Sequence, residues 1–155
     1  MGYGIGVKAW RNLMKIMDAA RYLIYLSYGK DNYSLTPLKL QKILYYVQGW
    51  SYVWDGVPVF TEEFEAWQYG PVNREVYEEF KGYKNREIPQ TEGKVPANAQ
   101  QSELETIESV WRDYGNETAS NLVSMTHSEA PWREAYQSGS NITNEEIKEY
   151  FMNTY

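Results

Sequence analysis

His127 is the side chain most readily suited to chemistry. It is the only histidine in the chain, and imidazole titrates near neutral pH without help from neighbours. Ser124, Ser128 and Glu129 are close in sequence, but neighbouring residues on a helix or turn point in different directions, so they do not define a catalytic triad. A lone histidine between two helices more often hydrogen-bonds a turn, and we expect a structural role.

Residue types exclude several other kinds of site. The absence of cysteine excludes disulfides, thiolate zinc sites, iron–sulfur clusters and cysteine nucleophiles. Acidic residues gather at 62–65 and 78–79, but nothing fixes the separation that glycoside hydrolysis requires. The glycines at 2, 4 and 6 follow no predicted strand, unlike a phosphate-binding loop, and we expect a flexible N-terminus over about residues 1–10. We therefore predict no catalytic residue, no metal site and no cofactor, in a protein that is not an enzyme.

Charge is distributed unevenly along the chain. Residues 1–54 carry seven Lys or Arg and two Asp, which gives +5, whereas residues 55–155 carry eight Lys or Arg and nineteen Asp or Glu, which gives −11. A nucleic-acid reader normally has a basic excess over its domain, so the total of −6 argues against nucleic acid as a partner. A basic face from the first third could still touch phosphates, although a solvated surface is the simpler interpretation.

Aromatic residues are unusually frequent, with 15 Tyr, 6 Trp and 4 Phe. Such residues fill cores, but they also dominate protein–protein hot spots and base-stacking surfaces. No apolar run reaches the roughly 18–20 residues that a membrane span needs, and residues 1–10 lack the apolar segment of a signal peptide. We expect a cytoplasmic protein without a membrane partner.

Hydrophobic spacing predicts a mainly α fold, a compact bundle of about six or seven helices around one buried central helix. The length suits a single domain over residues 1–155. The central helix is predicted at 36–54, because Thr36 and Pro37 form a start signal and apolar residues then cover most of the circumference. Further helices are predicted at 13–28, from Pro71 to Gly82, at 102–114 and 143–155 after capping boxes Ser102–Glu105 and Thr143–Glu146, and at 118–126 and 131–136.

Two segments lack helical spacing. In the region 57–70, Phe60, Phe64 and Trp67 alternate imperfectly with glutamates, which favours a small β-hairpin over an irregular segment. Residues 84–101 contain charges, two prolines and a glycine without periodicity, so they are predicted to form a loop that is either mobile or a contact surface.

Three motifs in order resemble a known family. They are the run from Leu38 to Trp50, the run from Glu65 to Val72 with Val76-Tyr77, and the segment from Thr126 to Trp132. Together they are similar to the Panacea-domain proteins, which include SocA-like antitoxins and phage-associated GepA proteins. The similarity extends over roughly Ile16 to Tyr150.

The resemblance implies a mostly helical antitoxin from a bacterial or prophage toxin–antitoxin pair. Such proteins neutralise a toxin encoded beside them by direct binding, so the implied partner is a cognate toxin of unknown identity. A SocA-like relative acts instead as an adaptor that delivers its toxin to the ClpXP protease, and other relatives have no demonstrated toxin. Two alternatives therefore stay open: a protease adaptor with a ClpXP-type partner, and a DNA-binding autoregulator that uses the basic N-terminal third.

The motif residues are expected to form scaffold, because large aromatics at helical spacing are usually core and because relatives with different toxins would share architecture. Gln41 and Lys42 interrupt an apolar helix, so they either pair inside the domain or mark its exposed side. Toxin contact is expected from the loop at 84–101 and from tyrosines assumed to be exposed. The scaffold set is Leu40, Gln41, Lys42, Tyr45, Trp50, Trp67, Tyr69, Gly70, Pro71, Val72, His127 and Trp132, and the contact set is Tyr45, Tyr46, Tyr52 and Arg86.

Overall fold

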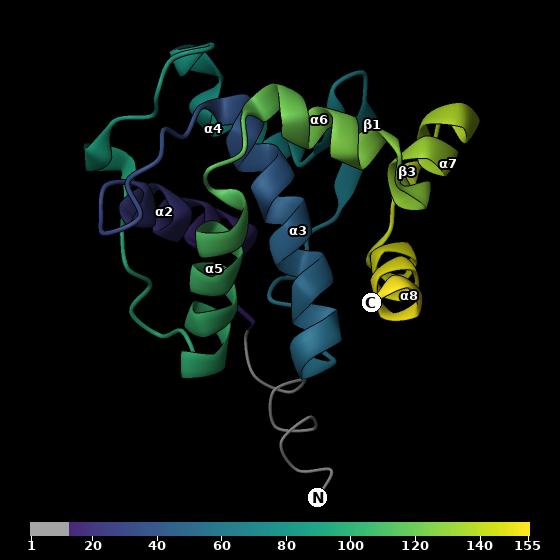
Figure 1. The fold of residues 1–155 in the computed structure, drawn as a ribbon, viewed down its shortest axis with the longest axis horizontal. Coiled ribbons are helices and arrows are strands. Elements are labelled where there is room, and N and C mark those ends of the chain that lie inside the picture. Colours follow the sequence, from purple (N-terminus) through teal and green to yellow (C-terminus); the bar gives the residue numbers. More distant parts are fainter. Residues whose placement is uncertain (1–12) are drawn as a thin grey trace, which may run out of the picture.

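Helix α3 (Pro37–Asp55) runs through the centre of the molecule (Figure 1). The structure is a computed structural model that describes residues 13–155, so the expected flexible segment at 1–10 lies outside the described residues. Around α3 pack α2 (Ile16–Ser27), α5 (Gln101–Tyr114), α6 (Ala119–His127) and α8 (Asn144–Thr154). The prediction of a mainly α fold around a buried central helix is confirmed.

The ends of α3 follow from local sequence chemistry. The Thr36 hydroxyl accepts a hydrogen bond from the Lys39 amide, and Pro37 occupies the first turn, where a missing N–H costs nothing. Gly56 ends the helix in the left-handed conformation at φ 72°. Every residue from Lys39 to Gly49 is buried, so the helix has no solvent-exposed face over three turns.

Helices α2 and α5 cover one side of α3 and contact each other (Figure 1). Both were predicted from their apolar spacing, and buried Ile107, Val110 and Trp111 of α5 face the core. The predicted capping box at Ser102 and Glu105 is wrong, because Glu103 instead accepts from the backbone N–H of Gln100 at 2.8 Å. That bond starts the helix at Gln101 with Gln100 as the cap.

A small antiparallel sheet joins two distant parts of the chain. Strand β1 (Phe64–Trp67) pairs with β2 (Gly70–Val72) on one edge and with β3 (Asn141–Ile142) on the other. The predicted hairpin is therefore confirmed, whereas the start at Pro71 predicted for the following helix is wrong. Pro71 lies opposite Ala66 in the ladder, and helix α4 (Arg74–Phe80) begins only after the Asn73 side chain caps it.

The segment 84–101 packs along α2 and is bonded to it. It contains the 3-10 turn η2 (Gln90–Glu92), and a second such turn, η1 (Lys81–Tyr83), precedes it. Ile88 is buried and bonds the Leu35 carbonyl through its amide, while the Lys94 amide bonds the Arg21 carbonyl. The guanidinium of Arg21 also forms ion pairs with Glu79 and Glu92. Of the two predicted alternatives, the contacts with α2 favour an ordered loop.

The C-terminal part consists of α6, α7 (Ala130–Ser138), β3 and α8. The helix predicted at 118–126 is α6, which Thr118 caps, and the predicted Thr143–Glu146 capping box opens α8. Ile147 and Phe151 of α8 are fully buried against the central helix. This arrangement brings the junction between α6 and α7 next to the hairpin, which positions the residues described below.

Candidate partner-binding site

The polar side chains of α3 bind segments outside the helix. Gln41 donates from Nε2 to the Asn73 carbonyl at 3.0 Å and accepts from the Asn73 amide at 2.8 Å. The ammonium of Lys42 donates to the Pro71 carbonyl at 2.8 Å and is fully buried. Of the two options left open by the sequence, the structure therefore selects pairing inside the domain.

Lys42 has no ion-pair partner among the described residues. Burial alone lowers the pKa of its ammonium to about 7, because the charged form loses its hydration and gains no counter-charge. The side chain therefore acts as a hydrogen-bond donor that holds β2 against α3.

Two adjacent tyrosines of α3 share one buried carboxylate. The hydroxyls of Tyr45 and Tyr46 donate to the two carboxylate oxygens of Glu129, each at 2.8 Å. Burial raises the pKa of Glu129 above its ordinary value, and the two hydroxyl donors partly oppose this effect. Glu129 stands immediately before α7, so this contact fixes the junction of α6 and α7 to the central helix.

Further along α3, Gln48 and Ser51 hold the segment that follows the helix. Gln48 donates to the Phe60 carbonyl at 2.7 Å and accepts from the Val59 amide at 3.0 Å, while the Ser51 hydroxyl donates to the Val57 carbonyl. Sequence reasoning missed these two residues and Glu129. The signal that marked Gln41, a polar residue in an otherwise apolar helix, applied equally to Gln48 and Ser51.

His127 and Trp132 join the hairpin to the α6–α7 junction. The Nε2–H of His127 donates to the Gln68 carbonyl at 2.9 Å, and its ring stacks on Trp132 with centroids 4.0 Å apart. The indole N–H of Trp132 donates to the Trp67 carbonyl at 2.8 Å. Each contact lies within the fold, which agrees with the structural role expected for His127.

Gly70 sits where the hairpin touches both α3 and α6. Its φ is +107°, and a Cβ there would lie 2.7 Å from Lys42 Cε and 2.8 Å from Thr126 Oγ1. Only glycine fits this position without a shift of its neighbours. Other scaffold candidates differ in exposure: Leu40, Pro71 and Val72 are buried, Trp50 and Trp67 are half-buried, and Tyr69 is 57% exposed.

The exposure assumed for three of the predicted contact residues is wrong. Tyr45, Tyr46 and Tyr52 are buried: other elements enclose α3 from Lys39 to Gly49, and the first two hydroxyls are bound by Glu129. These residues are unavailable to a partner in this conformation. Arg86 is exposed, at the start of the loop that packs along α2.

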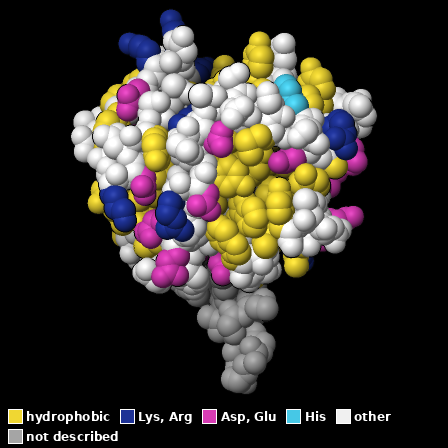
Figure 2. All heavy atoms as spheres, viewed as in Figure 1, with side chains coloured by type: hydrophobic (Ala, Val, Ile, Leu, Met, Phe, Trp, Pro, Cys, Tyr) yellow, Lys and Arg dark blue, Asp and Glu magenta, His cyan; other side chains and the backbone are white. Residues whose placement is uncertain are grey.

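Exposed aromatic rings instead gather at the C-terminal end of α3. Trp50 stacks on Trp54 with centroids 5.1 Å apart and lies 4.6 Å from the ring of Tyr155, while its indole N–H donates to the Tyr114 hydroxyl at 2.7 Å. Trp54 is 45% exposed and Tyr155 is 58% exposed. We call Trp50, Trp54, Tyr114 and Tyr155 the aromatic face. Figure 2 shows a continuous hydrophobic area over α3, between α5 and α8, with acidic side chains at its edge.

An exposed carboxylate lies beside the aromatic face. Burial raises the pKa of the Tyr114 hydroxyl to about 12, and the neighbouring carboxylate of Asp113 adds to that rise. Burial also raises the pKa of Tyr155. A cationic group that approached these rings would meet their π faces and the carboxylate of Asp113.

The basic first third contributes less positive surface than its sequence suggests. Lys39 and Lys42 are buried, and the Lys39 ammonium donates to the Ser34 and Gly115 carbonyls. Arg21 is engaged by Glu79 and Glu92. Of the described residues in this third, Lys15 and Lys30 remain as exposed cations without an ion pair to a described residue.

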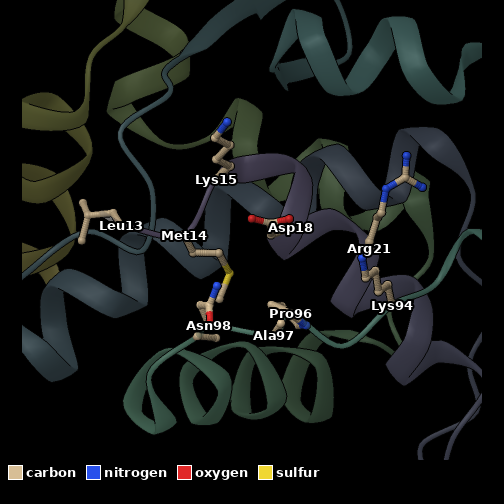
Figure 3. A pocket seen from close by; sticks show the side chains of 10 residues that line it. Leu13, Met14, Lys15, Asp18, Arg21, Lys94, Pro96, Ala97 and Asn98 are labelled. Atoms are coloured by element: carbon tan, nitrogen blue, oxygen red, sulfur yellow. The ribbon is translucent and has the colours of Figure 1, made fainter. Parts of the chain in front are cut away.

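A cavity of about 340 Å³ lies between the start of α2 and the loop at 94–99 (Figure 3). Asp18, Arg21 and Lys94 line it together with apolar Met14 and Pro96, and the side chain of Arg21 extends away from the cavity. It borders Leu13, the first described residue, and Arg21 is already bound to two glutamates. No group of three or more potential metal ligands occurs within residues 13–155, and none of the helices in that range is long and apolar enough to cross a membrane.

Comparison with known families decides what this architecture represents. The family described as "Antitoxin SocA-like, Panacea domain" matches residues 40–133, which include α3 from its second turn onward, the β1–β2 hairpin and the α6–α7 junction. The chain belongs to this family. The predicted resemblance is therefore confirmed, and the matched region contains every contact between α3 and the hairpin described above.

The protein named Antitoxin SocA, from Caulobacter vibrioides (strain NA1000 / CB15N), is 34% identical to this chain over 109 residues. The aligned region covers 63% of this chain and 58% of the relative, so the chain spans less than two thirds of that relative's length. No solved structure matches the chain significantly.

Proposed function

We propose that this chain is an antitoxin of a bacterial or prophage toxin–antitoxin pair that neutralises a cytoplasmic cognate toxin by direct binding. The observation that carries the proposal is membership of the Panacea-domain family together with a 34% identical relative named Antitoxin SocA. The arrangement of the described residues supports a binding role, because most motif residues make contacts inside the fold while aromatic rings are exposed at the end of α3.

The aromatic face is the surface proposed to contact the toxin. Tryptophan and tyrosine supply large contact areas at small cost in side-chain entropy and are the commonest hot spots of protein interfaces. Trp54 and Tyr155 are exposed, but Trp54 stacks on Trp50 and the tilted ring of Tyr155 packs against it, so both are held in place before a partner arrives. The acidic surroundings favour a partner with a basic, partly apolar contact surface.

Co-expression with the protein encoded next to this chain tests the proposal. Growth is scored with the neighbour alone and with both proteins, and a tagged copy of this chain is used for a pull-down. We expect the neighbour to arrest growth alone, to be harmless when co-expressed, and to be recovered in a stable complex. A harmless neighbour that is not recovered would contradict the antitoxin function.

A matched pair of substitutions tests the location of the contact. Trp54→Ala removes an exposed ring from the aromatic face, and Tyr25→Ala removes a ring of similar exposure from α2. We expect Trp54→Ala to weaken the complex about 30-fold or more and Tyr25→Ala to change it little. Equal effects would place the contact elsewhere.

Two further measurements distinguish the alternatives, a protease adaptor and a DNA-binding protein. If protection requires a ClpXP-type protease and the toxin disappears from the cells, this chain acts as an adaptor. If it instead binds random DNA duplex with a steep salt dependence, it acts on nucleic acid. Burial of Lys39 and Lys42 counts against the latter, because it withdraws two cations of the basic third from any DNA contact.

A further inference from the structure

A second recessed surface lies at the opposite end of α3 from the aromatic face. We call it the α4 groove: a cavity of about 530 Å³ between the first turn of α3, the β1–β2 turn and α4. Pockets that bind ligands span roughly 300–1,000 Å³, so the volume suffices for several side chains. The apolar wall consists mainly of Leu38, Trp67, Val72, Val76, Tyr77 and Phe80.

The charged groups that line the α4 groove are both lysines. Lys81 and Lys84 are exposed at its edge, next to the positive end of the α3 dipole at Pro37. Lys81 forms a solvent-exposed ion pair with Glu78, a kind of pair that contributes little and is readily exchanged. Lys84 forms no ion pair with any described residue. The lining of the groove thus contains two cations and no carboxylate, on a molecule of formal charge −6.

The backbone at Lys84 is strained. It is the one non-glycine residue in the described chain with a positive φ, at φ 57° and ψ −123°. A side chain in this region of backbone conformation is less favourable than glycine. The fold therefore holds a lysine, rather than a glycine, at the rim of the groove.

We propose that the α4 groove binds a segment of a partner protein that combines two or three bulky apolar side chains with an adjacent carboxylate. The apolar side chains would enter between Leu38, Val76 and Tyr77, and the carboxylate would meet Lys84 and Lys81. Charge complementarity identifies this occupant: a basic segment would be repelled by both lysines, and the acidic chain as a whole repels a second copy of itself.

The α4 groove and the aromatic face can be occupied together. Leu38 and Trp54 lie sixteen positions apart on α3, which corresponds to about 24 Å along the helix axis. The two surfaces also differ in the partner charge that they favour, which is basic at the aromatic face and acidic at the α4 groove. The groove proposal is independent of the proposed antitoxin function, and it gives the chain the means to hold two proteins at once.

Selection from a random octapeptide library displayed on phage tests the groove on the full chain. We expect the selected peptides to contain clustered apolar residues beside Asp or Glu. Their affinities are then measured by fluorescence polarisation with the wild-type chain and its variants. Peptides that are predominantly basic, or the failure of any peptide to enrich, would overturn the proposal.

Two groove variants and two controls complete the test. Leu38→Asp places a carboxylate in the groove, yet an acidic residue in the first turn of a helix is favourable, so the fold should be retained. We expect it to weaken the acidic peptides about tenfold and Lys84→Glu to weaken them about fivefold. Lys30→Glu makes the same charge change outside the groove and should leave binding unchanged. Thermal melting verifies folding of each variant.

The second control separates this proposal from the antitoxin function. Trp54→Ala should leave the selected peptides bound, and Lys84→Glu should leave protection against the toxin intact. Peptides that bind Leu38→Asp and Lys84→Glu as well as wild type would show that they occupy another surface and would overturn the proposal.

Discussion

Lys42 and Glu129 are ionisable side chains in the interior, and each is held by uncharged partners. Lys42 donates to a backbone carbonyl, and Glu129 accepts from two tyrosine hydroxyls. Burial without a counter-ion favours the neutral form of both groups, so their pKa values move in opposite directions. The stability of the protein should consequently carry two separate pH dependences.

Lys42 is expected to determine how the stability of the protein changes with pH above neutrality. Its pKa falls from 10.5 to about 7 on folding, so between these values the unfolded chain binds more protons and stability rises with pH. In Lys42→Met this rise should be reduced, and at pH 7 the variant should be more stable by about 1–2 kcal/mol. Urea unfolding from pH 7 to 9.5 measures both effects. A smaller rise from Lys39, whose pKa burial also lowers, should persist.

Lys30→Met is the control for that series, because Lys30 is exposed. It should follow the wild-type pH profile closely. If Lys42→Met showed the wild-type slope as well, the ammonium would be solvated in the folded state.

Glu129 is expected to affect the stability of the protein at lower pH than Lys42 does. Its pKa is raised from 4.5 on folding, so the native state retains its proton longer and stability falls as pH increases above the unfolded value. Glu129→Gln mimics the protonated form, and a tyrosine hydroxyl can accept as well as donate. We expect this variant to lack the decline and to gain about 1 kcal/mol at pH 8.

The contrasting variant is Glu129→Ala. It leaves the hydroxyls of Tyr45 and Tyr46 buried without a partner, which should cost about 2–4 kcal/mol at every pH. Urea midpoints of both variants from pH 4 to 8 test the pair. A uniform loss in Glu129→Gln equal to that of Glu129→Ala would refute the neutral-carboxyl interpretation.

At the scale of elements, Gly70 decides how closely the hairpin approaches α3 and α6. Gly70→Ala combines a positive φ with contacts below 3.0 Å to Lys42 and Thr126, and we expect a loss of about 3 kcal/mol. Gly56→Ala has a positive φ but open space around the added methyl, and should lose only about 1 kcal/mol. Chemical denaturation of both variants provides the comparison, and equal losses would show that the close packing contributes nothing.

Local signals in the sequence predicted most elements, and long-range pairing produced the errors. Thr36-Pro37 and the Thr143–Glu146 box act within a few residues, so α3 and α8 were predictable. Pro71 also resembles a helix start, but pairing with Ala66 places it in a strand. The two-residue strand β3 depends on contact with Phe64 and Glu65 and has no local pattern.

The residues of the candidate site also divide into those that local sequence predicted and those that depend on long-range contacts. The interior role of Gln41 and Lys42 followed from their position in an apolar helix, whereas the partner of Tyr45 and Tyr46 is a glutamate more than eighty residues away. Periodicity cannot reveal such a contact. It also cannot show which turns of α3 are enclosed and which reach the surface, which is why buried tyrosines were assumed to be exposed and the exposed ring of Trp54 was overlooked.

At the scale of the whole molecule, folding preserves the acidic balance of the sequence. It buries two lysines, Lys39 and Lys42, and two glutamates, Glu103 and Glu129, while most of the other carboxylates stay exposed. The buried charges cancel, so the surface keeps the acidic excess that the formal charge of −6 expresses. Long-range attraction of a basic toxin to this surface would accelerate encounter, and the aromatic face would determine how long the complex lasts.

This division predicts distinct kinetic effects for two substitutions near the aromatic face. Asp113→Lys reverses an exposed charge beside Tyr114 and should lower the association rate several-fold while it leaves dissociation nearly unchanged. Trp54→Ala should instead raise the dissociation rate about 30-fold or more, with little effect on association. Biolayer interferometry with the recovered toxin measures both rates.

Raising the salt from 50 to 500 mM should lower the wild-type association rate about tenfold, because exposed charges are screened within about 10 Å at 0.1 M. An association rate insensitive to salt and to Asp113→Lys would contradict electrostatic attraction, and a Trp54→Ala complex with wild-type lifetime would remove the aromatic face from the interface.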